Sequence, residues 1–194
     1  DLDVYGGQVL ALLGENGAGK STLMKIVYGF YRADAGEIAL AGKPVHIRSP
    51  HDARQIRIGM VFQDFTLIPA MSVVENVALF LPKLGSVLNH QQIAHQITQI
   101  AERYDLPIDP GAIVGQLSVG EQQKVEVLKL LLADSRVLIL DEPTKVLAPH
   151  EVDGLFRVFE KLKQDGYAVV FITHKLREVL ACATGFMIGL SGFA

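Results

Sequence analysis

Short apolar runs alternate with amphipathic stretches along most of this 194-residue chain. Residues 9–13 are continuously apolar, which is typical of a strand buried on both faces of a parallel sheet. We interpret residues 58–62, 137–140 and 168–172 as strands as well. Strands that alternate with helices predict a parallel sheet covered on both faces. The sequence therefore predicts an α/β fold.

Several helices are predicted from their first residues. Ser72 and Ser118 are each followed three residues later by glutamate, which is the capping-box pattern of a helix start. Ser49 precedes a proline that suits the first helical position. Residues 93–104 form one apolar stripe at helical spacing. Further helices are expected over residues 21–28, 151–162 and 175–180.

The middle of the chain is helical, whereas both ends alternate strands and helices. We expect one domain over residues 1–194, with a core formed by residues 1–63 and 136–194. A helical subdomain of residues 64–135 is inserted into that core. Two short strands around a turn are expected within residues 37–45. No apolar run approaches the roughly 20 residues of a membrane-spanning helix.

A glycine-rich turn follows the first predicted strand and precedes a predicted helix. It matches the pattern G-x-x-x-x-G-K-[ST] in full, with Gly14, Glu15, Asn16, Gly17, Ala18, Gly19, Lys20 and Ser21. In such a phosphate loop, backbone N–H groups turn toward phosphates and the helix N-terminus adds a favourable dipole. We expect Lys20 to reach the β- and γ-phosphates, Ser21 to ligate Mg²⁺, and Thr22 to belong to the same binding set. The alternative, an ordinary glycine turn, explains neither the full match nor the flanking elements.

Two carboxylates end the apolar strand of residues 137–140. Asp141 is expected to hold Mg²⁺, directly or through a water molecule. Glu142, one residue on, can polarise the water that attacks the γ-phosphate. A solvated acidic turn is the alternative, and the phosphate loop elsewhere in the chain argues against it.

Residues 117–123, with the sequence LSVGEQQ, contain a second candidate anion site. A serine, a glycine and a helix N-terminus come together there. The residues are Ser118, Val119, Gly120 and Glu121. Because one phosphate loop suffices for one ATP, we interpret this signature segment as serving an ATP held by a partner chain. A plain helix cap is the alternative.

Two polar residues follow predicted strands. Gln63 comes after the strand of residues 58–62, and His174 after that of residues 168–172. Ligands of open α/β sheets bind at the carboxyl ends of the strands, which makes both residues catalytic candidates. A structural role is the alternative for each. The other histidines show no metal-ligand spacing, and we expect them at the surface.

Composition narrows the range of functions. The net charge of −3 provides no basic footprint for nucleic acid, so no nucleic-acid partner is expected. The single cysteine, Cys182, cannot form an internal disulfide and is interpreted as a small buried hydrophobe. The chain begins a few residues before a buried strand, which we interpret as a sign that it is part of a longer protein.

The phosphate loop, Gln63, the segment LSVGEQQ, the stretch LILDEP and His174 resemble, in order and spacing, the motifs of ABC transporter ATPases. The resemblance implies a RecA-like core with a parallel sheet, an antiparallel β part and an inserted helical subdomain. It implies ATP hydrolysis with ATP and Mg²⁺, and a head-to-tail dimer with a second ATPase domain. Ser118 and Gly120 would contact the partner's γ-phosphate. Gln63, with Ser21 and Asp141, would belong to the Mg²⁺ site, and His174 would hold the γ-phosphate.

A finer resemblance is to the importers of simple sugars and nucleosides. It rests on the stretches GENGAGKSTLMKIVYGFYRADAGEI, VFQDFTLIPAMSVVENVAL and FITHKLREVLA. It implies a permease as membrane partner and a peripheral place on the cytoplasmic face of the cell membrane. Two ATPase domains are usually fused in that branch, and this sequence would be most of the first half.

Three features depart from the family pattern. In the family, the aromatic residue that stacks on adenine lies upstream of the strand at residue 9, and we expect it to be absent here. Tyr5 lies too close to that strand to be an obvious substitute. Ala148 stands where many relatives have an acidic residue, which puts communication between subunits in question. Residues 184–194 lack the expected charged pattern, so the C-terminal strands are expected to be incomplete or divergent.

Three other functions were weighed. DNA-repair and chromosome ATPases of this fold carry long coiled-coil insertions, whereas the segment between the phosphate loop and the signature segment is short here and has no heptads. ABC proteins that act on ribosomes usually carry basic inserts, and none is present. A regulatory domain without hydrolysis is disfavoured by the presence of Glu142 and His174.

Overall fold

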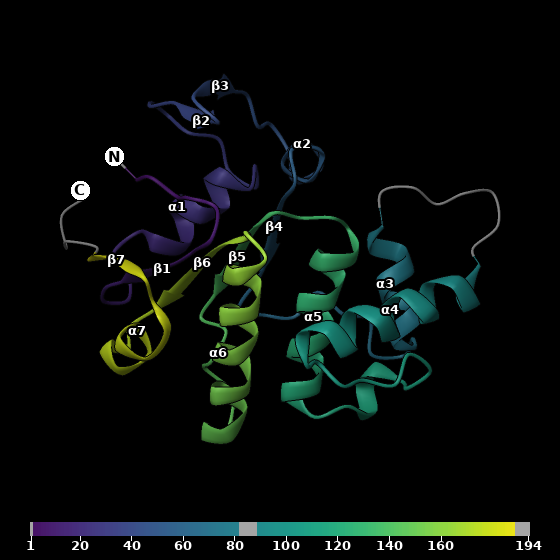
Figure 1. Cartoon of the computed structure of the whole chain (residues 1–194). Coiled ribbons are helices and arrows are strands. Elements are labelled where there is room, and N and C mark those ends of the chain that lie inside the picture. The colour runs from purple at the N-terminus through teal and green to yellow at the C-terminus, as the bar shows by residue number, and fades with distance from the viewer. Residues whose placement is uncertain (1, 82–88, 189–194) are drawn as a thin grey trace.

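The centre of the molecule is a five-stranded parallel sheet with the strand order β4–β5–β6–β1–β7 (Figure 1). The computed structural model describes residues 2–81 and 89–188 of the chain. The strands are β1 (Gln8–Leu13), β4 (Ile58–Val61), β5 (Val137–Asp141), β6 (Ala168–Thr173) and β7 (Gly185–Ile188). The predicted α/β class with a parallel sheet is confirmed.

Both faces of the sheet are covered, which explains the continuous apolar runs of its strands. In β1, Val9 and Ala11 belong to one core cluster, whereas Leu10 and Leu12 belong to another. Side chains alternate between the two faces of a strand, so each face needs its own apolar layer.

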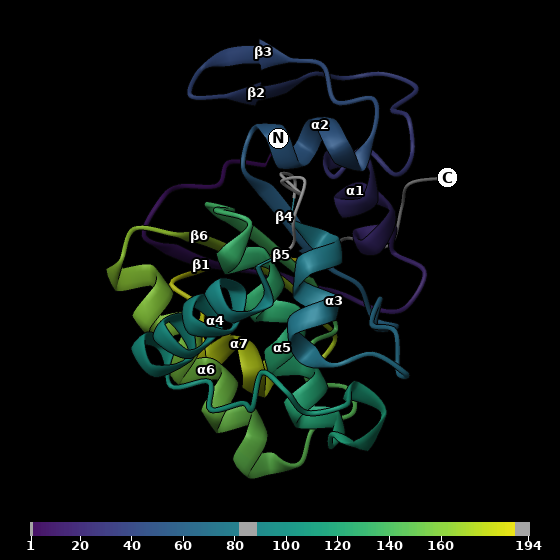
Figure 2. The same ribbon diagram turned by 90° about the vertical axis from the view of Figure 1, so that its right-hand side faces the viewer.

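Helices form the two covering layers, as Figures 1 and 2 show. On one face, α1 (Lys20–Val27) and α2 (Pro50–Gln55) contribute Met24 and Ala53 to the smaller core cluster. The other face is covered by the remaining helices, with α3 and α4 packed on α5. These are α3 (Val73–Phe80), α4 (His90–Tyr104), α5 (Val119–Leu132), α6 (Pro149–Gln164) and α7 (Leu176–Cys182).

The small β part is a separate hairpin. Strands β2 (Ile38–Leu40) and β3 (Lys43–Val45) pair antiparallel. Ala41 and Gly42 turn the chain with φ of 50° and 74°, the left-handed conformation that such tight turns use. The predicted pair of short strands, and the antiparallel β part that the family resemblance implied, are thereby confirmed.

Both predicted capping boxes are present. The Ser72 hydroxyl accepts from the Glu75 N–H while the Glu75 carboxylate accepts from the Ser72 N–H, and Ser118 pairs with Glu121 in the same way. Hydrogen bonds from the Ser118 N–H and hydroxyl hold the pKa of Glu121 below its usual value. Each box satisfies backbone donors that helix starts leave without partners.

The C-terminal end of α4 is attached to the turn that follows α6. The Asp165 carboxylate accepts from the Tyr104 hydroxyl at 2.7 Å and from the Arg103 guanidinium at 2.7 and 3.1 Å. The Tyr104 ring is fully buried, and these hydrogen bonds, that from Tyr104 first, hold the pKa of Asp165 below its usual value.

We expect Asp165→Asn to lower the free energy of unfolding at pH 7 by about 1 kcal/mol, since it weakens hydrogen bonds to a charged acceptor at a partly exposed site. For a domain of this size the melting temperature falls by about 2–4 °C. A carboxylate whose pKa is lowered by folding contributes stability above its unfolded pKa and loses it as the pH falls through the folded pKa. Thermal unfolding should therefore show the wild type and variant converging below about pH 4. An undiminished difference at pH 3 would contradict this explanation.

The predicted division of the chain stays a prediction. Leu130 of α5 lies against Gly59 of β4, where an added side chain would collide with it, so the predicted subdomain of residues 64–135 shares packing with the core. No helix in the described ranges is long and apolar enough to cross a membrane. Strand β7 lies within the stretch predicted to diverge, and residues 189–194 of that stretch are outside the described residues.

Candidate functional site

The strand registers bring four of the predicted site residues to one edge of the sheet. Leu13 pairs with Thr173, so Gly14 and His174 leave the sheet as neighbours. Asp141 pairs with Ile172 and Leu140 with Val61. Glu142 and Gln63 therefore emerge at the same edge, which is the carboxyl end of every strand concerned.

The phosphate loop wraps around the Lys20 side chain. Gly17 and Gly19 have φ of 85° and 78°, and Gly19 is the N-cap of α1. The Lys20 ammonium donates to the backbone carbonyls of Gly14 and Glu15, each at 2.8 Å, and only 9% of the residue is exposed. The loop thus holds a cation at the N-terminal end of a helix, which is the arrangement that binds phosphate.

Ser21 and Asp141 form the second part of the site. The Ser21 hydroxyl donates to Asp141 Oδ1 at 2.8 Å. Asp141 is 3% exposed, and burial raises its pKa despite the hydrogen bond from Ser21. Two hard oxygen donors beside a phosphate loop fit Mg²⁺, which usually takes one or two protein ligands and completes its shell with phosphate and water. A divalent cation would also offset the cost of burying the carboxylate.

Glu142 and His174 face each other across the sheet edge. His174 Nδ1 lies 3.3 Å from Glu142 Oε1, and the Lys145 ammonium lies 4.0 Å from Glu142 Oε2. Glu142 has a φ of 47°, an uncommon left-handed conformation for a glutamate, and its N–H donates to the Ile172 carbonyl. Such strained conformations gather at functional sites. A carboxylate in this position can take a proton from a water molecule, and the imidazole can donate to a phosphate oxygen.

Glu178 fixes the two loops that carry this pair, and the sequence analysis missed it. Its carboxylate is buried and accepts from the hydroxyls of Thr144 and Thr173, both at 2.7 Å. Lys175 completes the cluster with an ammonium 2.9 Å from the same carboxylate. The sequence did contain a signal for it. Glu178 is a charged residue on the side of the predicted helix of residues 175–180 that faces the core, where a carboxylate needs buried hydrogen-bond partners. Beside it, Cys182 is partly buried rather than fully buried as expected, and burial raises the pKa of its thiol to about 12.

Gln63 is the predicted site residue that the structure connects least. Its position at the sheet edge agrees with the prediction, and its side chain is exposed. In the part of the chain that the structure describes, no side-chain hydrogen bond joins it to Ser21, Asp141 or Glu142. Its role as a Mg²⁺ ligand therefore stays a prediction.

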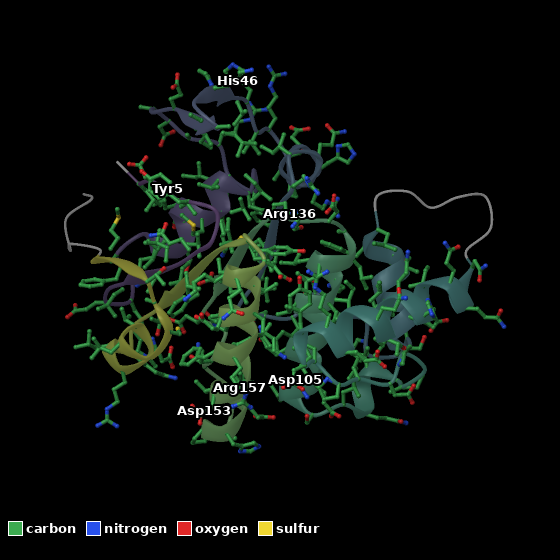
Figure 3. All side chains as sticks on the ribbon, viewed as in Figure 1. Tyr5, His46, Asp105, Arg136, Asp153 and Arg157 are labelled. Carbon is green, nitrogen blue, oxygen red and sulfur yellow. The ribbon has the colours of Figure 1, made fainter. Side chains whose placement is uncertain are left out.

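The signature segment lies away from the phosphate loop of the same chain. Gly14, Glu15, Asn16 and His174 line an open pocket of about 440 Å³. A separate pocket of about 490 Å³ lies between the end of α4, the start of α5 and helix α6. It contains Ser118, Gly120 and Glu121. Asp105 and Arg157, which are labelled in Figure 3, also line it. The two anion sites thus do not meet within one chain.

Glu151 is a second residue that the sequence analysis missed. Its carboxylate caps α6 by accepting from the Ala148 N–H at 2.8 Å, and it also lies directly against Gly120. A side chain at Gly120 would overlap this carboxylate and displace it. The carboxylate of Glu151 thus connects the start of α6 to the signature segment.

Tyr5 does not contribute to the pocket of the phosphate loop. The residue, labelled in Figure 3, is 64% exposed and is not among the residues that line that pocket. Its N–H donates to the Gln8 side chain. This agrees with the expectation that Tyr5 is no substitute for an adenine-stacking residue.

Comparison with known sequences connects this site to one family. A family model described as ABC transporter matches residues 1–145. The ribose import ATP-binding protein RbsA of Hahella chejuensis is 47% identical over 179 residues, covering 91% of this chain and 36% of the relative. The glucose import ATP-binding protein of Haloferax volcanii is 45% identical, covering 93% of this chain and 38% of the relative. The chain thus spans little more than a third of the length of the curated relatives it matches.

Solved structures agree on the fold. An ATP-binding cassette of an ABC transporter in its ADP conformation superposes with a TM-score of 0.83 at 26% identity, covering 96% of this chain and 78% of the other. A dimeric bacterial ABC transporter cassette superposes with a TM-score of 0.80 at 24% identity, covering 97% of this chain and 84% of the other. The second likeness bears on the fold alone.

Proposed function

The chain belongs to the ABC transporter family, and we propose that it is an ATP-binding and ATP-hydrolysing domain that powers import of a small polar solute. The observation that carries the proposal is the juxtaposition at the sheet edge. Lys20 lies inside the phosphate loop, Ser21 is hydrogen-bonded to Asp141, and Glu142 faces His174.

Each residue has a part in hydrolysis that follows from its place. The phosphate loop and Lys20 bind the β- and γ-phosphates, and Ser21 and Asp141 would hold a Mg²⁺ ion. Such an ion would offset the negative charge of the phosphates. Glu142 accepts a proton from the attacking water, while His174 orients Glu142 and donates to the γ-phosphate. The Glu178 cluster keeps the last two side chains in place.

A second ATP-binding domain completes the site. The signature segment opens a different pocket from the phosphate loop, so we expect it to meet the γ-phosphate of an ATP bound by a partner. Ser118 is exposed, whereas Gly120 is buried against the Glu151 carboxylate, which has to move aside before Gly120 can contact a phosphate. A helix N-terminus favours an anion there. The partner is a second copy or a second domain of the same protein.

The solute is inferred from relatives. Proteins named for ribose and glucose import are 45–47% identical to this chain, which supports a sugar or nucleoside as cargo. We place the domain on the cytoplasmic face of the cell membrane, bound to a permease. Co-purification of the complete protein with a membrane permease, followed by ATP-dependent sugar uptake into vesicles, tests this proposal. A complex without a permease, or uptake that is independent of ATP, would contradict it.

We propose that the permease contacts an apolar pocket next to the loop of residues 63–68, which is called the Gln63 loop below. The pocket has a volume of about 280 Å³ and includes Ile68 and Leu79, which are 42% and 53% exposed. Leu67, the neighbour of Ile68 in the sequence, does not line this pocket. It packs against the larger core cluster. Exposed apolar groups that gather around a pocket usually meet a partner.

We expect Ile68→Glu combined with Leu79→Glu to reduce permease binding by about tenfold or more, because charges would enter an apolar contact. The ATP affinity of the isolated domain should be unchanged. Leu180→Glu, at a residue that is 77% exposed on α7, is the control and should leave the complex intact. Pull-down with the permease measures the effect, and equal recovery of both variants would refute this docking site.

A further inference from the structure

A buried polar network joins the loop after Gln63 to helix α5. Glu126 Oε1 accepts from the Thr66 N–H at 2.7 Å and from the Thr66 hydroxyl at 3.0 Å. The Lys129 ammonium donates to Thr66 Oγ1 at 2.9 Å and to Glu126 Oε2 at 3.0 Å. Helix α5 thus supplies both charges, and the loop supplies one threonine that contacts both of them.

The network is shielded from water. The side chains of Lys129 and Glu126 are 4% and 2% exposed. A buried ion pair is a weak source of stability, because the cost of desolvation offsets the attraction, and apolar residues of similar volume often serve as well. A role in fixing the position of Thr66 therefore explains the pair better than a role in folding does.

The network lies close to Gln63, to the signature segment and to the proposed permease pocket. Thr66 is three residues after Gln63, and α5 begins in the signature segment with Ser118 as its cap. Thr66 and Lys129 also line the proposed permease pocket, where the Lys129 ammonium lies 5.1 Å from the Phe80 ring. Neither charged residue lines the pocket of the phosphate loop.

We propose that Glu126 and Lys129 are positioning residues that make the Gln63 loop and α5 move as one unit. Any displacement of the loop that carries Thr66 is thereby passed to α5 and to the signature segment at its start. The inference rests on the proposed function, since it assumes that the chain binds ATP. It assigns these residues no contact with the nucleotide.

The double variant Glu126→Leu, Lys129→Met separates this role from folding. It removes both charges together, so no unpaired charge stays buried, and the melting temperature should be close to that of the wild type. The pair Glu160 and Lys163, also three residues apart but on the surface of α6, provides the matched control Glu160→Leu, Lys163→Met.

The measurement is amide hydrogen exchange of residues 64–68 and 118–121 in the complete protein, with and without Mg²⁺ and the non-hydrolysable analogue AMP-PNP. In the wild type and the control, the analogue should slow exchange in both segments. In the double variant, exchange of the Thr66 amide should rise about tenfold, as expected for loss of a hydrogen bond to a charged acceptor. The response of residues 118–121 should disappear although the affinity for the analogue is unchanged.

Thr66→Val is a second variant that leaves the ion pair in place. It removes the hydroxyl and keeps the backbone hydrogen bond, so the response of residues 118–121 should weaken without vanishing. A full response of that segment in a folded double variant would overturn the inference and leave ATP binding untouched. A wild type that does not bind AMP-PNP would instead contradict the proposed function.

Discussion

Glu142→Gln should abolish turnover and leave ATP binding intact. The amide keeps the shape of the side chain and its contact with His174, but it cannot accept a proton from the attacking water. Loss of a general base typically costs roughly 10²- to 10⁴-fold in rate. Because hydrolysis no longer separates the two ATP-binding domains, a dimer that contains ATP should accumulate, and analytical ultracentrifugation should detect it.

The control for this variant is Glu160→Gln, at an exposed glutamate of α6. It should turn over ATP at the wild-type rate and form no stable dimer. If Glu142→Gln hydrolysed ATP at the normal rate, the base would lie elsewhere, and the left-handed conformation of Glu142 would need another explanation.

Lys20→Ala should weaken ATP binding by about ten- to a hundredfold, because it removes the buried cation from the phosphate loop. Hydrolysis should fall by a further factor of roughly 10²–10³, since the same charge stabilises the transferred phosphoryl group. Calorimetry with ATP and a phosphate-release assay measure the two effects separately.

Lys43→Ala is the matched control, because that lysine is exposed on the β2–β3 hairpin. Both variants should retain cooperative thermal unfolding. Removal of Lys20 also leaves the Gly14 and Glu15 carbonyls without their donor, so a small loss of stability is expected. Normal affinity and turnover in Lys20→Ala would remove the basis for the phosphate-loop assignment.

Much of the fold could be predicted because its signals are local. The apolar runs, the serine caps at Ser72 and Ser118 and the turn at Gly42 each specify an element within a few residues. The strand order β4–β5–β6–β1–β7 depends instead on pairing between segments that are distant in the sequence, and periodicity carries no information about it.

The same distinction applies to the site. The phosphate loop and the pair Asp141 and Glu142 are contiguous motifs, so the sequence alone identifies them as candidates. Glu178, Glu126 and Glu151 act through partners from 3 to 60 residues away, and in the sequence each resembles an ordinary helical glutamate. Only burial and the hydrogen-bond partners distinguish them. The position of Gln63 relative to Ser21 and Asp141 could not be predicted either, because it depends on the path of an exposed loop.

The central claim is that this chain hydrolyses ATP at the sheet edge that carries Lys20, Asp141 and Glu142. Its most direct test is phosphate release from ATP by the complete protein, measured with Mg²⁺ and with EDTA, for the wild type and for Lys20→Ala and Glu142→Gln. We expect Mg²⁺-dependent release by the wild type and a release lower by about a hundredfold or more in either variant. Absence of release by a folded wild type that binds ATP, or equal release by all three proteins, would contradict it.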